Sequence, residues 1–170
     1  MTNKDLNTNL TQRHSFPPYA NPDAKILILG SMPGERSLEL NQYYGHPMNR
    51  FWRVMANICG AELPSQYQDR LIMLSQNQIA LWDVAAKAVR EGSLDSAIKD
   101  VEPNDIMALI DSLSSLTCIA FNGKKAEQLF AKYFRRIEGL SYLSLPSTSP
   151  ANAAYSLDSL IKQWSVIKRF

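Results

Sequence analysis

At 170 residues, the chain is long enough to form one domain around its own hydrophobic core. Hydrophobic residues make up 45% of it, charged residues make up 20%, and the formal net charge is +2. These values exclude a strongly basic protein that coats nucleic acid, but not a local basic face. No apolar run is long enough to span a membrane, and the first ten residues are too polar for a signal peptide. Cys59 and Cys118 lie far apart in apolar segments, so we expect buried free thiols and a cytoplasmic location.

In chain order, a polar lead over residues 1–13 precedes a single domain over residues 14–170. The two prolines of HSFPP (14–18) hold the start of that domain extended. Short apolar runs predict four strands, at residues 25–29, 78–84, 116–121 and 140–145. Helical spacing, with Gly60 as a stop and Pro103 in a first turn, predicts helices at about 48–60, 66–76, 103–113, 124–134 and 154–167 and a helical turn at 37–40. The segment 87–100, interrupted by Gly92, is expected to be a loop or a broken helix.

This alternation of strands and helices predicts an α/β protein with a parallel sheet and helices on both faces. Ligands bind at the carboxyl ends of the strands in such a sheet. The sequence places the turn 30–34, Asp83, Asn122 and the segment 145–152 at that edge. We therefore expect these four parts of the chain to surround a binding site, although Asn122 is also a suitable cap for the helix that follows it.

The turn GSMPG (30–34) is the most distinctive of these parts. Gly30 and Gly34 are free to adopt positive φ and Pro33 fixes one dihedral angle, so the turn can be rigid and can aim main-chain N–H groups at a ligand. Tyr43 and Tyr44 follow it, and then GHPMNRFW (45–52), which is an unusual density of stacking surfaces and polar side chains for a loop. The simpler alternatives are a tight turn that binds nothing and tyrosines that serve only packing.

Several enzyme classes are excluded by missing motifs. GSMPG matches neither the phosphate-binding P-loop nor the dinucleotide-binding pattern, and no serine lies in the glycine frame of a nucleophile elbow. No group of His, Cys and carboxylate residues has the spacing of metal ligands. What remains is a pocket of Asn, Ser, Thr and Tyr side chains, which suits recognition of a neutral heterocycle.

Taken together and in this order, GSMPG (30–34), YYGHPMNRFW (43–52) and LPSTSPAN (145–152) resemble the uracil-DNA glycosylase superfamily. LWDV (81–84) and GSLD (92–95) make the chain most similar to the hypoxanthine-DNA (deoxyinosine) glycosylase branch. The resemblance covers about residues 14–167. It implies a three-layer α/β/α sandwich with a central four-stranded parallel sheet. It also implies hydrolysis of the N-glycosidic bond of a deaminated base flipped out of DNA, double-stranded or also single-stranded, with no metal or cofactor.

The resemblance further implies how the catalytic water is held. The superfamily usually has an Asn or Asp in the first motif for this purpose, but the corresponding residue here is Met32. In the hypoxanthine branch the role passes to an asparagine further along, for which Asn49 is the best match and Asn41 the alternative. A neutral amide would orient water by hydrogen bonding, because it is a poor base. Asn49 is equally suited to cap the helix that begins there.

Base recognition is expected from the turn and from two further side chains. Tyr44 occupies a position where related enzymes stack an aromatic ring on the base, and the Asp83 carboxylate can accept the N1–H of hypoxanthine, although Asp83 is also a plausible loop anchor. Main-chain N–H groups of the turn are suited to hold the negative charge of the departing base. The predicted base-binding residues are Gly30, Ser31, Met32, Pro33, Gly34, Tyr44 and Asp83.

Contacts to DNA phosphates are expected from Ser147, Thr148 and Ser149, which replace the second motif of the superfamily and its histidine or asparagine. Lys124 is a further candidate, although a solvated helix face is the simpler interpretation. We expect a monomer. Two other functions stay open at this point: a glycosylase for uracil or mismatches, and a non-catalytic module that binds a nucleobase.

Overall fold

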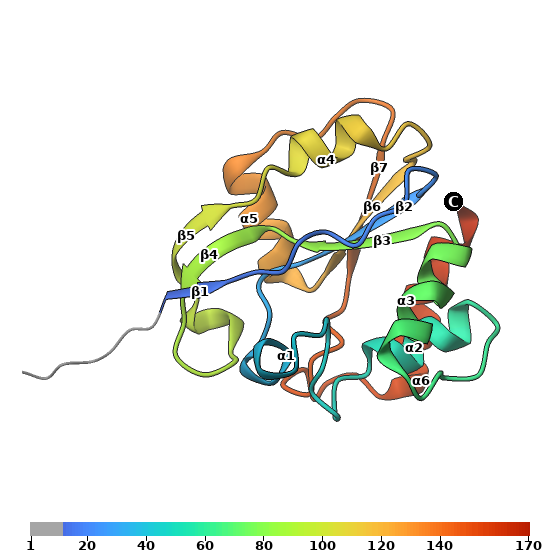
Figure 1. Ribbon diagram of the computed structural model, residues 1–170, viewed down its shortest axis with the longest axis horizontal. Coiled ribbons are helices and arrows are strands. Elements are labelled where there is room, and N and C mark those ends of the chain that lie inside the picture. Colours follow the sequence, from blue (N-terminus) through green and yellow to red (C-terminus); the bar gives the residue numbers. More distant parts are fainter. Residues whose placement is uncertain (1–11) are drawn as a thin grey trace, which may run out of the picture.

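The computed structural model describes residues 12–170 and contains one parallel sheet with the strand order β3-β2-β6-β7 (Figure 1). The strands are β2 (Ile26–Gly30), β3 (Ile79–Asp83), β6 (Cys118–Asn122) and β7 (Ser141–Leu145). Each strand lies within or close to one predicted apolar run, and helices cover both faces, so the predicted three-layer α/β/α architecture is confirmed. Of the predicted polar lead, residues 1–11 lie outside the described residues.

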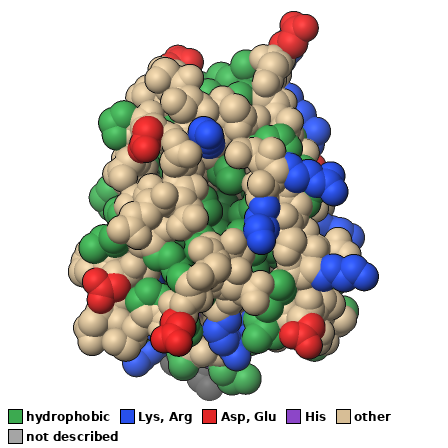
Figure 2. Space-filling model, turned by 90° about the vertical axis from the view of Figure 1, so that its right-hand side faces the viewer, with side chains coloured by type: hydrophobic (Ala, Val, Ile, Leu, Met, Phe, Trp, Pro, Cys, Tyr) green, Lys and Arg blue, Asp and Glu red, His purple; other side chains and the backbone are tan. Residues whose placement is uncertain are grey.

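Alternate residues of β2 enter two separate hydrophobic cores, because successive side chains of a strand point to opposite faces of the sheet. Ile26 and Ile28 belong to the core covered by α2 (Phe51–Ile58), α3 (Tyr67–Gln76) and α6 (Leu157–Trp164), which is followed by a 3-10 turn (Ser165–Arg169). Leu27 and Leu29 belong to the core covered by α4 (Ile106–Ser112) and α5 (Lys124–Tyr133). Figure 2 shows the side of the molecule where α2, α3 and α6 lie, with hydrophobic side chains along its middle and Lys and Arg mostly on one half.

A second, three-stranded antiparallel sheet was not predicted. It consists of β1 (Gln12–His14), β4 (Ala85–Val89) and β5 (Lys99–Pro103) in the order β1-β4-β5. The expectation of a loop or broken helix over 87–100 is therefore wrong at its two ends, which belong to β4 and β5, and is confirmed for 90–98, where a loop contains one short 3-10 turn (Asp95–Ala97). Only Val84 separates β3 from β4, so the chain passes directly from the parallel sheet into the small one (Figure 1).

Two predicted helix starts also differ from the structure. Pro103 is not in a helix but ends β5, and the helix begins at Ile106 because the side chain of Asp105 accepts the N–H of Ala108 as a cap. The helix predicted from about residue 48 begins at Phe51. The predicted turn at 37–40 is part of α1 (Glu35–Leu40).

The expectations about cysteines and membrane spans can be compared with the structure of residues 12–170. Both cysteines are free thiols, with Cys118 buried and Cys59 half-buried. None of the helices in this part of the chain is long and apolar enough to cross a membrane.

Candidate functional site

One cavity of about 400 Å³ opens at the carboxyl end of the parallel sheet, within the range of small-molecule sites. It is lined by the turn 30–34, by parts of 43–49 and 147–152, by Asp83 and Asn122, and by the connection between β4 and β5. Most predicted site residues meet here: Gly30, Ser31, Met32, Pro33, Gly34, Tyr44, Asn49, Asp83, Ser147, Thr148 and Ser149. Asn41, exposed at the end of α1, and Lys124, exposed at the start of α5, do not line the cavity.

Asn49 is held in one orientation by hydrogen bonds from two donors. Its Oδ1 accepts the main-chain N–H of Phe51 at 2.9 Å and the hydroxyl of Thr148 at 2.9 Å. Both acceptor sites of the amide oxygen are thereby occupied, so the oxygen cannot also accept from a ligand. The Nδ2 group donates no hydrogen bond to any residue of 12–170, which leaves an amide donor at the cavity wall.

Thr148 and Asn122 form a reciprocal pair behind Asn49. Asn122 Nδ2 donates to Thr148 Oγ1 at 3.0 Å, and the main-chain N–H of Thr148 donates to Asn122 Oδ1 at 3.0 Å. Thr148 is 0% exposed, so its hydroxyl cannot make the phosphate contact expected from the sequence; it fixes Asn49 instead. Asn122 does not cap α5, because both ends of its amide bind Thr148 and the capping position is Gly123.

Asp83 presents one carboxylate oxygen to the cavity. Ser15 donates to Oδ2 at 3.2 Å, whereas Oδ1 lies beside Gly30 and accepts no hydrogen bond from residues 12–170. The side chain is buried, at 4% exposure. Burial raises the pKa of Asp83 to about 7, although the hydrogen bond from Ser15 and the charge of Arg90 act in the opposite direction. Near neutral pH the group therefore exists both as an acceptor and as a donor.

Tyr44 contributes an aromatic wall. Its ring stacks on Phe51, with ring centroids 3.9 Å apart and an interplanar angle of 23°. Its backbone φ is +52°, a left-handed conformation that is unfavourable for a side chain of this size and is common at functional sites. Tyr43, in contrast, is buried, and its hydroxyl donates to the carbonyl of Pro17 at 2.7 Å, which confirms the packing alternative for that residue.

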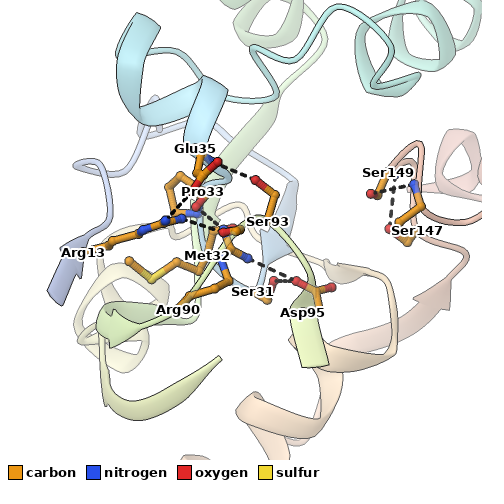
Figure 3. A network of polar contacts seen from close by, with 12 residues as sticks. Arg13, Ser31, Met32, Pro33, Glu35, Arg90, Ser93, Asp95, Ser147 and Ser149 are labelled. Carbon is orange, nitrogen blue, oxygen red and sulfur yellow. Dashed lines mark hydrogen bonds and ion pairs between the residues drawn. The ribbon is translucent and has the colours of Figure 1, made fainter. Parts of the chain in front are cut away.

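The connection between β4 and β5 fixes the position of the glycine turn (Figure 3). Arg90 donates to the carbonyls of Met32 and Pro33 and lies 3.5 Å from Asp95 Oδ1, to which Ser31 Oγ donates at 2.7 Å. Arg90 is 3% exposed, and its Nε has no partner within residues 12–170. Arg90 could not be predicted as a site residue because no motif contains it and the carbonyls that it binds are more than 50 residues away in the chain.

The comparisons with known proteins agree with this geometry. The family model of the uracil DNA glycosylase superfamily matches residues 17–168. The chain belongs to this superfamily. Two relatives are named hypoxanthine DNA glycosylase. The one from Methanosarcina barkeri is 42% identical over 91% of this chain and 96% of its own length. The one from Methanosarcina acetivorans is 38% identical over 92% of this chain and 98% of its own length.

A solved structure supports the same assignment. The solution NMR structure of a Methanosarcina acetivorans protein, which its name places provisionally among the uracil DNA glycosylases, has a TM-score of 0.79 to this chain. The two sequences are 37% identical, and the match covers 94% of this chain and 98% of that one. The cavity thus occurs on the sheet and loop framework of the superfamily.

Met32, which the resemblance predicted to replace the superfamily's water-holding Asn or Asp, packs with Ala85, Ala88 and Ile98 in a small apolar cluster. It also lines the cavity. The main-chain N–H groups of Met32 and of Gly34 donate no hydrogen bond to residues 12–170, so they are free to donate to a ligand. Among residues 12–170, no three or more His, Cys, Asp or Glu side chains form a group that could hold a metal ion.

Gly30→Ala is expected to lower DNA glycosylase activity by about 100-fold or more, because displacing a functional side chain such as Asp83 by about 1 Å has effects of this size. A Cβ at this position would lie 2.5 Å from Asp83 Oδ1 and 3.2 Å from the Tyr44 hydroxyl. The contact displaces the site rather than the core, so circular dichroism should show a folded protein. Gly34→Ala should lose less, because its closest neighbour is the exposed Ser93 hydroxyl at 3.2 Å. Equal rates for Gly30→Ala and wild type would contradict the position of Asp83.

Arg50→Met is expected to lower the free energy of unfolding by about 2 kcal/mol. The guanidinium donates to the carbonyls of Ser149 at 2.7 Å and Asn152 at 2.9 Å, and also to that of Tyr155. It thereby secures the segment that carries Thr148. Urea denaturation would measure the loss, with Arg53→Met, an exposed arginine on α2, as the control. A urea midpoint equal to that of the wild type would show that these hydrogen bonds make no net contribution to the free energy of unfolding.

Proposed function

We propose that the chain is a monofunctional DNA glycosylase that hydrolyses the N-glycosidic bond of deoxyinosine and releases hypoxanthine. The observation that carries this proposal is the uncommitted Oδ1 of Asp83, buried at the end of β3 and turned to the cavity. A base paired in a duplex cannot reach such a buried group, so the nucleotide must be flipped out of the stack.

Hypoxanthine differs from adenine at the edge that Asp83 is placed to read. Hypoxanthine carries a proton on N1, and adenine has a lone pair there. The Asp83 carboxylate accepts the N1–H of hypoxanthine and repels the N1 lone pair of adenine, which rejects the normal base. A site built to pair with one hydrogen-bonding group discriminates strongly against an analogue that lacks it. Tyr44, stacked on Phe51, supplies a flat surface for the purine ring.

Asn49 positions the attacking water through its Nδ2 donor. A water that accepts one N–H from Asn49 keeps its other lone pair for the anomeric carbon of the sugar. Cleavage leaves negative charge on the departing base, and the free main-chain N–H groups of Met32 and Gly34 are suited to stabilise it. Asn49 is not the general base: the proton that the water loses on attack goes to the departing hypoxanthine anion, which leaves as the neutral base.

DNA phosphates are proposed to contact the hydroxyls of Ser147 and Ser149, which line the cavity opposite the β4–β5 connection (Figure 3). Lys124 at the exposed start of α5 is proposed as a further phosphate contact. The substrate is double-stranded DNA, and a monomer suffices, because every group of this mechanism lies in one chain.

A labelled duplex with a single inosine tests the proposal. The duplex is incubated with the protein and then heated in alkali, which breaks the strand only where a base has been removed. Strand breaks at inosine, and far fewer in a matched uracil duplex, are the expected result. Breaks mainly at uracil would assign the other branch of the superfamily. Tight binding to inosine DNA without breaks would instead assign a non-catalytic base-binding module.

A further inference from the structure

Hypoxanthine and guanine present the same groups at the edge that Asp83 is proposed to read. Both purines carry a proton on N1 and an oxygen on C6; they differ at C2, which bears a hydrogen in hypoxanthine and an amino group in guanine. A single carboxylate oxygen that accepts N1–H therefore rejects adenine but not guanine. A carboxylate that turns both oxygens to the base would favour guanine, because one oxygen accepts N1–H and the other accepts an N–H of the 2-amino group. The orientation of the Asp83 carboxylate thus decides whether this normal base is bound.

The structure turns one of the two oxygens to the cavity. Oδ1 lies beside Gly30, where an added Cβ would be 2.5 Å away, and both Asp83 and Gly30 line the cavity. Oδ2 instead accepts the hydroxyl of Ser15 at 3.2 Å, and Ser15 is not part of the cavity lining. No other side chain of residues 12–170 donates to this carboxylate. Because rotation about χ2 of an aspartate is soft, the bond from Ser15 is what keeps Oδ2 away from a bound base.

Ser15 is itself held in place on both sides. Its main-chain N–H donates to the carbonyl of Ala86 at 2.8 Å, and Trp82 Nε1 donates to the carbonyl of Phe16 at 2.9 Å. The Ser15 hydroxyl also lies 3.4 Å from the carbonyl of Phe16, but the carboxylate is the closer acceptor and, when ionised, the stronger one. The segment between β1 and β2, which runs along β3, therefore presents a fixed hydroxyl to Asp83 (Figure 1).

We propose that Ser15 is a positioning residue that makes the site accept hypoxanthine and reject guanine. By holding Oδ2 away from the cavity, Ser15 leaves one acceptor on Asp83 for the one N1–H of hypoxanthine. Guanine bound in the same way would lose the water around its 2-amino group and find no second acceptor on Asp83, and a desolvated N–H without a partner is costly. The inference rests on the proposed function, because it concerns how that site reads the flipped base.

The test measures the binding of two duplexes whose target nucleotide carries fluorine at C2′, which prevents cleavage of the N-glycosidic bond. The target is deoxyinosine in one duplex and deoxyguanosine in the other, and each faces a stable abasic analogue, so that neither base has to be unpaired. Wild-type protein should bind the inosine duplex more tightly. Ser15→Ala should reduce this preference by about 10- to 100-fold, the range for one hydrogen bond to a charged group. Ser15→Thr, which keeps the hydroxyl, should retain the wild-type preference.

Ser112→Ala is the matched control, because Ser112 is an exposed serine of α4 outside the cavity lining; its preference should equal that of the wild type. A purely structural role of Ser15 would weaken binding of both duplexes equally, so an unchanged preference in Ser15→Ala overturns the inference. Equal binding of both duplexes by the wild type, or a preference lost in Ser15→Thr as in Ser15→Ala, also overturns it. A wild-type protein that releases no hypoxanthine from a cleavable inosine duplex refutes the proposed function instead.

Discussion

Asp83→Asn is expected to reduce hypoxanthine excision by about 10³- to 10⁴-fold, the penalty for mispairing a buried polar edge. Ser15 donates to one atom of the side chain, so the amide oxygen of the variant would take that position and the amide NH2 would face the cavity. Two donors, the amide and the N1–H of hypoxanthine, would then oppose each other. Single-turnover rates with inosine DNA measure the effect. Unchanged excision in Asp83→Asn or Asp83→Ala would remove Asp83 from the mechanism.

The same residue makes activity depend on pH. The pKa of Asp83 is about 7 because of burial, so the carboxylate that accepts N1–H is lost as the pH falls below 7. The charged and titratable groups that influence it are Arg90, Asp95, Tyr43 and Tyr44. Wild-type excision should therefore decline on the acidic side of about pH 7. A rate that is constant from pH 5 to pH 8 would contradict this assignment.

Asp83→Asn should at the same time stabilise the fold at neutral pH. The unfolded pKa of an aspartate is about 3.9, so the native state binds more protons than the unfolded state between about pH 4 and pH 7. The free energy of unfolding of the wild type thus falls as pH rises through that window, by an amount on the order of a few kcal/mol. The variant has no such loss. Urea denaturation at pH 5 and pH 8 should show the larger gain at pH 8, and a variant less stable than wild type at pH 8 would be inconsistent.

Asn49→Ala is expected to lower excision by about 10²- to 10⁴-fold by removing the donor that positions water. The fold should lose about 1 kcal/mol, because Asn49 also accepts the N–H of Phe51 at the start of α2. Excision from inosine DNA and urea denaturation separate the two effects.

Asn41→Gly is the matched control for Asn49→Ala. Asn41 is the alternative asparagine of the sequence analysis, lies outside the cavity lining and has a φ of +53°, which glycine adopts readily. Its excision rate should equal that of the wild type. Loss of activity in Asn41→Gly with full activity in Asn49→Ala would exchange the two roles.

The parallel sheet could be predicted because its strands are uninterrupted apolar runs. Strands covered on both faces need such runs, and Ile26 to Leu29 are all buried. Strand β4, with the sequence AAKAV, has no comparable signal: only Ala85 and Ala88 are fully buried. Its strand conformation results from pairing with two other strands. Of these, β1 is distant in the sequence, and β5 follows only after the loop that connects it to β4.

The candidate site divides in the same way. Gly30 and Asp83 lie at strand ends, so their approach to one cavity followed from the topology, whereas Tyr44 and Asn49 were expected there from the resemblance of their motif. The burial of Thr148 could not be predicted, because it depends on the reciprocal bonds to Asn122. A serine- and threonine-rich loop has the same composition whether its hydroxyls face DNA or the protein interior.

The most direct test of the account is to identify the released base. Excess protein is incubated with an inosine duplex, and the small molecules are separated by chromatography, with Asn49→Ala in parallel. Wild-type protein should release free hypoxanthine in amounts that match the abasic sites formed, and should release no adenine. Asn49→Ala should bind the duplex but release less than about one-hundredth as fast. An intact inosine duplex with the wild-type protein, or undiminished release by Asn49→Ala, would contradict the account.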